Sequence, residues 1–208
     1  MSVVRSLCLG FLLLNGGWTQ VPPPAVAVSQ PPGLRPCDDC VPGVINFAKV
    51  DAALWRGSQP TAEGFQNLEK LGVRTIVSFR HDNDDLPLLK GTKLKYLRIP
   101  SRAFRPKDAN IALFLKLMQE PAHWPVFIHC AQGRDRTGYN AAAYRMVYQG
   151  WKAEDAIAEM KTFRFNRVWL TNPGYMRSLD VEGMKQRMAV SPAPQPMAVS
   201  TSSAARRP

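Results

Sequence analysis

A chain of 208 residues, 45% apolar and 21% charged, is long enough for one hydrophobic core and too short for two large ones. Its formal net charge of +11 favours anionic ligands. The sequence contains no run of five Lys or Arg residues and no basic helical stripe, so we do not expect nucleic acid as a partner.

The first 27 residues resemble a secretory signal peptide. Arg5 precedes an apolar stretch at residues 7–14, and Ala25-Val26-Ala27 form a small-x-small motif that is a candidate cleavage site. The apolar stretch is too short to span a bilayer, so we expect no stable membrane span after signal removal. An apolar strand or a permanent anchor is the alternative. The sequence therefore predicts an exported protein, periplasmic or secreted.

Residues 28–43 are predicted to form a Pro-rich linker. In an oxidising compartment Cys37 and Cys40 would form a local disulfide, which leaves Cys130 free. A redox or zinc module is the competing hypothesis. Turn residues surround the first pair, and His129 lies directly beside Cys130, which is not the usual chelating spacing, so we predict no metal.

From residue 44 to residue 188 the sequence alternates short apolar runs with helical patterns. The predicted strands are residues 45–50, 54–56, 73–79, 94–99 and 126–128. The predicted helices are one that Thr61 caps and Gly72 ends, and residues 109–118, 137–149, 153–163 and 174–188. Residues 81–85 read as an acidic loop. The alternation predicts a single α/β domain with a central, mostly parallel sheet flanked by helices, followed by a disordered tail at 189–208.

A loop that binds an anion is expected after the buried run at 126–128. Ligands of such sheets bind beyond the carboxyl ends of the strands. A strand, a tight turn and a helix start can direct consecutive backbone N–H groups at one centre, and the helix adds its positive end. Gly133 permits the curvature that this turn needs. The sequence therefore predicts phosphate binding by Ala131, Gln132, Gly133, Arg134, Asp135 and Arg136.

Two side chains of this segment fit phosphoryl transfer. Cys130 follows the strand in the positive field of the loop, which lowers the pKa of its thiol and supplies a thiolate nucleophile. The planar guanidinium of Arg136 can hold two phosphate oxygens. We predict that Thr137 donates a hydrogen bond to the thiolate and that His129 holds the loop through neighbouring backbone.

Residues 129–138 match the H-C-x5-R-[ST]-G signature of the cysteine-dependent protein tyrosine and dual-specificity phosphatases. Asn46-Phe47, residues 54–60 and residues 71–77 also resemble the atypical dual-specificity phosphatases, and the likeness covers roughly residues 44–165. The resemblance implies a phosphotyrosine-phosphatase-like fold. It also implies that Cys130 attacks phosphorus, that Arg136 binds the phosphoryl group, and that water hydrolyses the phosphocysteine without a metal or cofactor.

The general acid is where the sequence departs from the usual pattern of this family. Asp108 is the only carboxylate in the loop where the family carries its acid, and it could equally be a helix N-cap. Asp135 is the preferred acid, because C-x-x-G-x-D-R-T resembles the loop of myotubularin-type and exported bacterial phosphatases. The alternative is that Asp135 only forms an ion pair, its partners then being Arg134, Arg136 or Lys107.

Four basic residues suggest multiply phosphorylated substrates, although each could equally be a solvated surface charge: Arg102, Arg105, Lys107 and Arg134. The predicted substrates are phosphotyrosine proteins, phosphoinositides or inositol polyphosphates, and the sequence does not choose among them. A pseudophosphatase that only binds phosphate is the alternative. It predicts loss of Cys130 or Arg136, and both are present.

Overall fold

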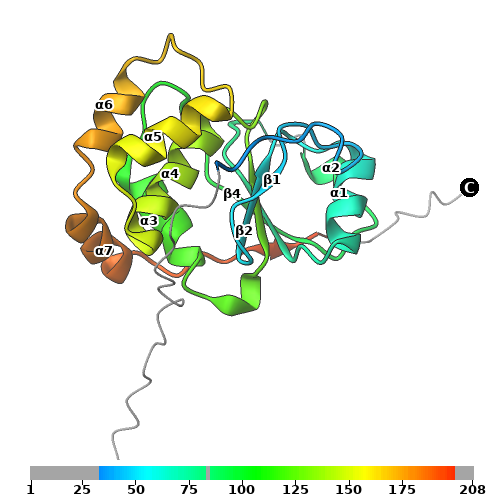
Figure 1. The fold of residues 1–208 in the computed structure, drawn as a ribbon. Helices are drawn as coiled ribbons and strands as arrows, with labels where there is room; N and C mark the ends of the chain where they lie inside the picture. The colour runs from blue at the N-terminus through cyan, green and yellow to red at the C-terminus, as the bar shows by residue number, and fades with distance from the viewer. Residues whose placement is uncertain (1–32, 83–84, 200–208) are drawn as a thin grey trace, which may run out of the picture.

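The structure, a computed structural model, describes residues 33–82 and 85–199. The predicted signal peptide at 1–27 lies outside the described residues. Figure 1 shows a central sheet with helices on both of its faces. The predicted α/β fold with a mostly parallel sheet is confirmed.

The sheet has six strands in the order β1-β2-β5-β3-β4-β6. Their bounds are β1 Ala48–Lys49, β2 Leu54–Gly57, β3 Thr75–Ser78, β4 Lys95–Arg98, β5 Val126–His129 and β6 Met197–Ala198. The four inner strands are parallel, whereas β1 and β6 pair antiparallel at the two edges. Strand β5 lies between β2 and β3, so the segment that leaves its carboxyl end emerges near the middle of the sheet.

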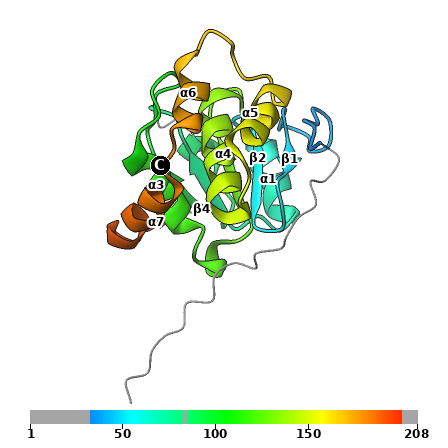
Figure 2. The same cartoon turned by 60° about the vertical axis from the view of Figure 1, so that its left-hand side comes forward.

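Helices cover the two faces unequally, as Figures 1 and 2 show. The larger core packs α3 to α7 on one face, and the smaller one packs α1 and α2 on the other. The helical bounds are α1 Ala62–Lys70, α2 Asp85–Leu88, α3 Asp108–Leu117, the 3-10 turn η1 Pro121–His123, α4 Asp135–Gln149, α5 Ala153–Thr162, α6 Thr171–Arg177 and α7 Val181–Val190. No helix among the described residues is both long enough and apolar enough to cross a membrane.

The predicted boundaries of the first helix are confirmed by its capping contacts. The Thr61 side chain accepts a hydrogen bond from the Gly64 N–H at 3.1 Å, which satisfies one of the free donors of the first turn. Gly72 follows the helix with φ at +98°, a conformation that glycine adopts without steric cost.

Two predictions at the start of the domain are wrong. The strand predicted at 45–50 is limited to β1, because Asn46 has φ at +55° and interrupts extended pairing. The linker predicted at 28–43 is structured at its end: Cys37 pairs with Phe47 backbone to backbone, and the Val41 side chain is buried.

Three predictions elsewhere also differ from the structure. The helix predicted at 174–188 is two helices, because the Asp180 side chain accepts from the Gly183 N–H at 2.9 Å and starts α7 anew. The acidic loop at 81–85 ends in the short helix α2. The predicted tail begins inside α7 and contributes β6, which occupies the open edge of β4.

Candidate active site

The candidate site lies where three parallel strands end together. In the sheet register His129 pairs with both Gly57 of β2 and Ser78 of β3. The segments that follow these strands therefore leave the sheet at one edge, and Cys130 emerges between the other two.

The loop after Cys130 has its carbonyl oxygens held outward by neighbouring segments. The Gln59 N–H donates to the Ala131 oxygen at 3.2 Å. The buried Asn46 side chain donates from Nδ2 to the oxygens of Gln132 and Gly133, at 3.2 and 3.0 Å. With these carbonyls fixed outward, the amides between them are turned toward the opposite, inner side of the loop.

The loop amides are available to an anion. Among the described residues no carbonyl or carboxylate accepts from the N–H groups of residues 131–137, and the first bond of α4 runs from the Gly138 N–H to the Arg134 oxygen. The N–H groups of Gln132 and Thr137 lower the pKa of the Cys130 thiol through their interaction with its sulfur. The amides thus face the sulfur, and a helix N-terminus adds its partial positive charge.

Only glycine fits at position 133. Its φ is +67°, and a Cβ there would lie 2.7 Å from the Ser58 nitrogen and still closer to the Gly57 carbonyl. The turn that was predicted to need Gly133 therefore also needs close packing against the segment after β2.

The environment of Cys130 favours a thiolate. Cys130 is a free cysteine and only 3% exposed, and this burial raises the pKa of the thiol. Interaction with the Thr137 hydroxyl and N–H, the positive charge of Arg136 and the Gln132 N–H lower the pKa of the thiol and outweigh burial, so it lies below its ordinary value.

Arg136 lies beside the sulfur, as its effect on the thiol indicates. Its Nη1 donates to the Phe79 oxygen at 3.4 Å, which orients the guanidinium from the segment after β3. Its buried Nε has no hydrogen-bond partner among the described residues. A phosphate group in the loop would supply an acceptor for such a donor.

Asp135 bonds to backbone rather than to a cation. Its Oδ1 accepts from the Asn166 N–H at 2.8 Å, and within the described ranges it forms no ion pair with any of the basic partners expected for it. The carboxylate ties the start of α4 to the segment between α5 and α6.

Asp108 is held elsewhere. The Tyr175 hydroxyl donates to its Oδ1 at 2.6 Å, and the Arg187 Nε lies 3.3 Å from its Oδ2. Asp108 lines a cavity of about 600 Å³ beside α6 and α7, which no residue of the 129–138 segment lines. The N-cap position of α3 belongs to Lys107, so the predicted capping role of Asp108 is wrong.

His129 is fully buried beside Asp85, a carboxylate of the predicted acidic loop. His129 Nδ1 lies 3.3 Å from the Cys130 oxygen, and its Nε2 lies 3.4 Å from Asp85 Oδ2. Asp85 is itself fully buried and accepts from Gln59 Nε2 at 2.8 Å and from the Tyr96 hydroxyl at 3.0 Å. These contacts tie His129, the residue before Cys130, to the segment after β2, to α2 and to β4.

Arg56 is a second functional residue that sequence reasoning missed. It is fully buried in β2, its Nη2 donates to the Gly133 oxygen at 3.0 Å, and its guanidinium lies 3.8 Å from the centre of the Phe163 ring. Burial lowers its pKa to about 10, while the negative charges of Glu159 and Cys130 act in the opposite direction. A cation inside an otherwise buried strand was the available sequence signal, because such charges are rarely buried without a partner.

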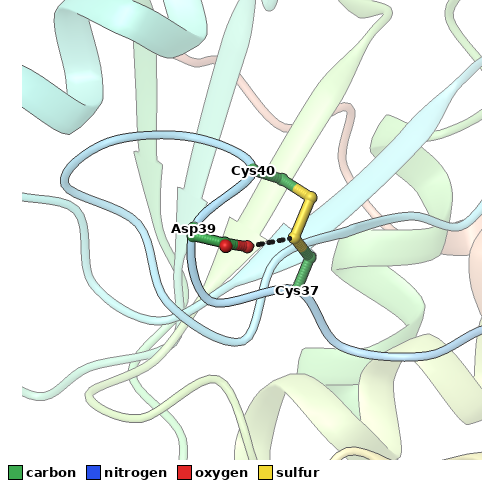
Figure 3. Close-up of side chains that lie close together, drawn as sticks. All are labelled: Cys37, Asp39 and Cys40. Carbon is green, nitrogen blue, oxygen red and sulfur yellow. Dashed lines mark hydrogen bonds between the residues drawn. A yellow bond between two sulfur atoms is a disulfide. The ribbon is translucent and has the colours of Figure 1, made fainter.

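The predicted pair Cys37 and Cys40 forms a disulfide with a Cα–Cα distance of 5.6 Å. Figure 3 shows it beside Asp39, whose Oδ1 lies 3.1 Å from the Cys37 sulfur. These three residues form a potential metal-ligand group that includes neither His129 nor Cys130, and sulfurs joined in a disulfide offer a metal no thiolate.

The disulfide loop is linked to the loop after Cys130 through Asn46 and Arg164. Asp38 Oδ1 accepts from the Asn46 N–H at 2.9 Å, and Asp38 also pairs with Arg164 at 2.6 Å. Arg134 Nε donates to the Arg164 carbonyl. Both paths end on the outer side of the loop that follows Cys130.

The other basic residues expected at the entrance lie on one loop. Arg102, Arg105 and Lys107 are exposed on the segment before α3. The Tyr139 hydroxyl donates to the Arg102 oxygen at 3.2 Å, one helical turn beyond Arg136. The loop therefore borders the same end of α4 as the candidate site.

Comparison with known proteins yields a family model and several relatives. The model described as "DSP-PTPase phosphatase fused to NAD+ Kinase" matches residues 43–187. The dual specificity protein phosphatase TpbA of Pseudomonas aeruginosa strain UCBPP-PA14 is 33% identical over 192 residues, which cover 91% of this chain and 85% of that protein.

A yeast relative and a solved structure extend the comparison. The inositol diphosphatase SIW14 of Saccharomyces cerevisiae is 25% identical over 150 residues, 68% of this chain and 53% of that protein. The crystal structure of a cysteine-to-serine variant of P. aeruginosa TpbA in complex with phosphotyrosine matches with a TM-score of 0.64 at 30% identity. That match covers 78% of this chain and 99% of the TpbA chain.

Proposed function

This chain belongs to the cysteine-dependent dual-specificity phosphatase family, and we propose from this that it hydrolyses phosphate monoesters through a cysteinyl-phosphate intermediate. The observation that carries the proposal is the arrangement around Cys130. A sulfur with a lowered thiol pKa faces loop amides from which no carbonyl among the described residues accepts, and the Arg136 guanidinium lies beside it.

In the first step the Cys130 thiolate attacks phosphorus and forms the S–P bond. The loop amides and Arg136 hold the non-bridging oxygens while charge spreads over them. The bond from phosphorus to the leaving oxygen breaks, and its electron pair stays on that oxygen. Asp135, whose Oδ1 is anchored by Asn166, donates a proton from Oδ2 to the leaving group.

In the second step a water molecule attacks the phosphocysteine. The Asp135 carboxylate accepts a proton from the water, the S–P bond breaks, and its electron pair returns to sulfur as the thiolate. Inorganic phosphate leaves, and the enzyme regains its starting protonation states.

Two substrate classes are proposed, phosphotyrosine proteins and inositol phosphates or phosphoinositides. TpbA is named a dual specificity protein phosphatase and has been crystallised with phosphotyrosine, and SIW14 is named an inositol diphosphatase. The basic loop at 101–107 supports anionic substrates of either class.

Phosphate release from a phosphotyrosine peptide, a phosphoinositide and phytate tests the proposal. We expect turnover of at least one substrate, and we expect Cys130→Ser and Arg136→Lys to abolish it. Turnover by Cys130→Ser at the wild-type rate would refute the nucleophile. Tight phosphopeptide binding by the wild type without any phosphate release would instead favour a pseudophosphatase.

We also propose that the protein is exported to the periplasm or secreted. The Cys37–Cys40 disulfide supports this location, because disulfides persist in oxidising compartments. Mass spectrometry of the native protein should find a mature N-terminus after Ala27. An intact N-terminus on protein recovered from the cytoplasm would contradict the proposal.

A further inference from the structure

Exposed apolar side chains gather around the candidate site. Four large ones are Ile45, Phe104, Val168 and Leu170, which are 53%, 44%, 68% and 81% exposed. Isolated exposed apolar residues are ordinary, but several around one site mark an interaction surface.

Each of these residues belongs to a segment that contacts the site. Ile45 precedes Asn46, whose side chain holds the phosphate loop. Val168 and Leu170 follow Asn166, the backbone partner of Asp135. The Phe104 ring lies 5.6 Å from that of Trp169, which joins the loop before α3 to the loop before α6.

The same two loops carry charge of a single sign. Residues 101–107 and 163–171 contain five basic residues and no carboxylate, the basic ones being Arg102, Arg105, Lys107, Arg164 and Arg167. In the part of the chain that the structure describes, only Arg164 of these forms an ion pair, with Asp38. The other four are exposed.

One segment of this face protrudes from the fold. In both Figure 1 and Figure 2 the segment between α5 and α6 rises above the rest of the described fold. This segment, residues 163–170, includes the exposed side chains of Val168 and Leu170. An extended peptide needs a groove that surrounds it, whereas a protruding apolar segment among cations suits insertion into a flat anionic interface.

We propose that Phe104, Val168, Leu170 and the cations around them form a docking face for the surface of an anionic lipid bilayer. Insertion of the apolar side chains and attraction of the cations to anionic headgroups both contribute to the free energy of binding, and together they give reversible binding. The mouth of the site would then face the bilayer. Membrane docking does not depend on the proposed function. That phosphate monoesters carried by lipids are substrates follows from docking only together with the proposed function.

Vesicle sedimentation of the full chain tests the docking face, with vesicles of phosphatidylcholine alone and of equal parts phosphatidylcholine and phosphatidylglycerol. We expect partition onto the anionic vesicles only. Arg167→Gln should weaken it about fivefold, since each cation near such a surface contributes on that order. Val168→Ser/Leu170→Ser should weaken it at least about tenfold.

The matched control is Leu71→Ser/Arg74→Gln, which removes an exposed apolar residue and an exposed cation. Both residues lie just before β3, at the amino ends of the parallel strands, whereas the candidate site lies at their carboxyl ends. The control should bind as the wild type does. All variants share one N-terminus, so differences among them report this face. Equal binding by every variant, an equal loss in the control, or no anionic binding by the wild type would overturn the proposal.

Assays with soluble substrates separate the remaining outcomes. The variants at 167, 168 and 170 should keep wild-type turnover of p-nitrophenyl phosphate. If they lose turnover of a phosphotyrosine peptide while vesicle binding is unchanged, the face binds peptide and the lipid proposal is wrong. If the wild type binds vesicles but releases no phosphate from any substrate, the proposed function fails and the docking face stands.

Discussion

Replacing Thr137 with valine tests the electrostatic basis of the nucleophile. Thr137 is fully buried, and its hydroxyl gives the largest of the effects that lower the pKa of the Cys130 thiol. Valine keeps the shape and the backbone N–H but removes the hydroxyl. Burial, which raises the thiol pKa, stays as it was, so the balance shifts toward the neutral thiol.

The size of the effect follows from the bond that is lost. A hydrogen bond to a charged group contributes about 1.5–3 kcal/mol, which corresponds to roughly 10- to 100-fold in the thiol–thiolate equilibrium. Since the hydrogen bond favours the charged form, its loss raises the thiol pKa. Alkylation and turnover should therefore fall by roughly that factor on the acid side of the profile and converge with the wild type at alkaline pH.

Iodoacetamide alkylation across a pH series measures this directly, with the peptide that contains Cys130 quantified by mass spectrometry. Thr137→Ser is the matched control, because it keeps the hydroxyl. The acid limb, which is the rise in the alkylation rate with pH below the thiol pKa, should then stay near its wild-type position. The reasoning is refuted if Thr137→Val leaves the acid limb unchanged, or if Thr137→Ser moves it equally far.

Three further predictions concern other contacts of the loop. Asp135→Asn should reduce turnover of alkyl phosphates about 100-fold or more and that of aryl phosphates little, since only poor leaving groups need the proton; equal losses in steady-state assays would remove its role as acid. Arg56→Met should lower the free energy of unfolding, measured in urea, by about 1.5–3 kcal/mol, because the hydrogen bond to the Gly133 oxygen is lost. It should also raise the pKa of the Cys130 thiol, because the positive charge of Arg56 interacts with the thiolate. Arg56→Lys should restore the pH profile of Cys130 alkylation, and an unchanged profile in Arg56→Met would contradict this interaction. Cys37→Ser/Cys40→Ser should lower the free energy of unfolding by about 2 kcal/mol in the same urea experiment. The wild type reduced with dithiothreitol should show the same decrease. If the variant is as stable as the oxidised wild type, the disulfide is not needed to hold its loop.

The sequence was sufficient for features that depend on neighbouring residues. A β-branched run, a glycine turn and a helix start define the loop after Cys130, because backbone geometry over ten residues is largely a local matter. The cap at Thr61 and the stop at Gly72 belong to the same class. The alternation of strands and helices fixed the fold class for the same reason.

Contacts between distant segments could not be derived in this way. Asn46 and Arg56 bind the carbonyl of Gly133, from which they are separated by more than seventy residues in the sequence. A pattern along the chain does not say which strands lie side by side. The sequence predicts Asp85 as part of an acidic loop, and only the fold shows that this carboxylate lies beside His129. Asp108 was an acid candidate by position, but α6 and α7 fold back and bind its carboxylate.

The sequence alone determined that a thiol and a guanidinium share one anion-binding turn, because both lie within seven consecutive residues. Only the tertiary structure decided which distant groups hold the carbonyls of that turn outward and which carboxylate stays near it. Hydrogen bonds and burial depend on distances in space, and those distances are set by packing of the whole chain.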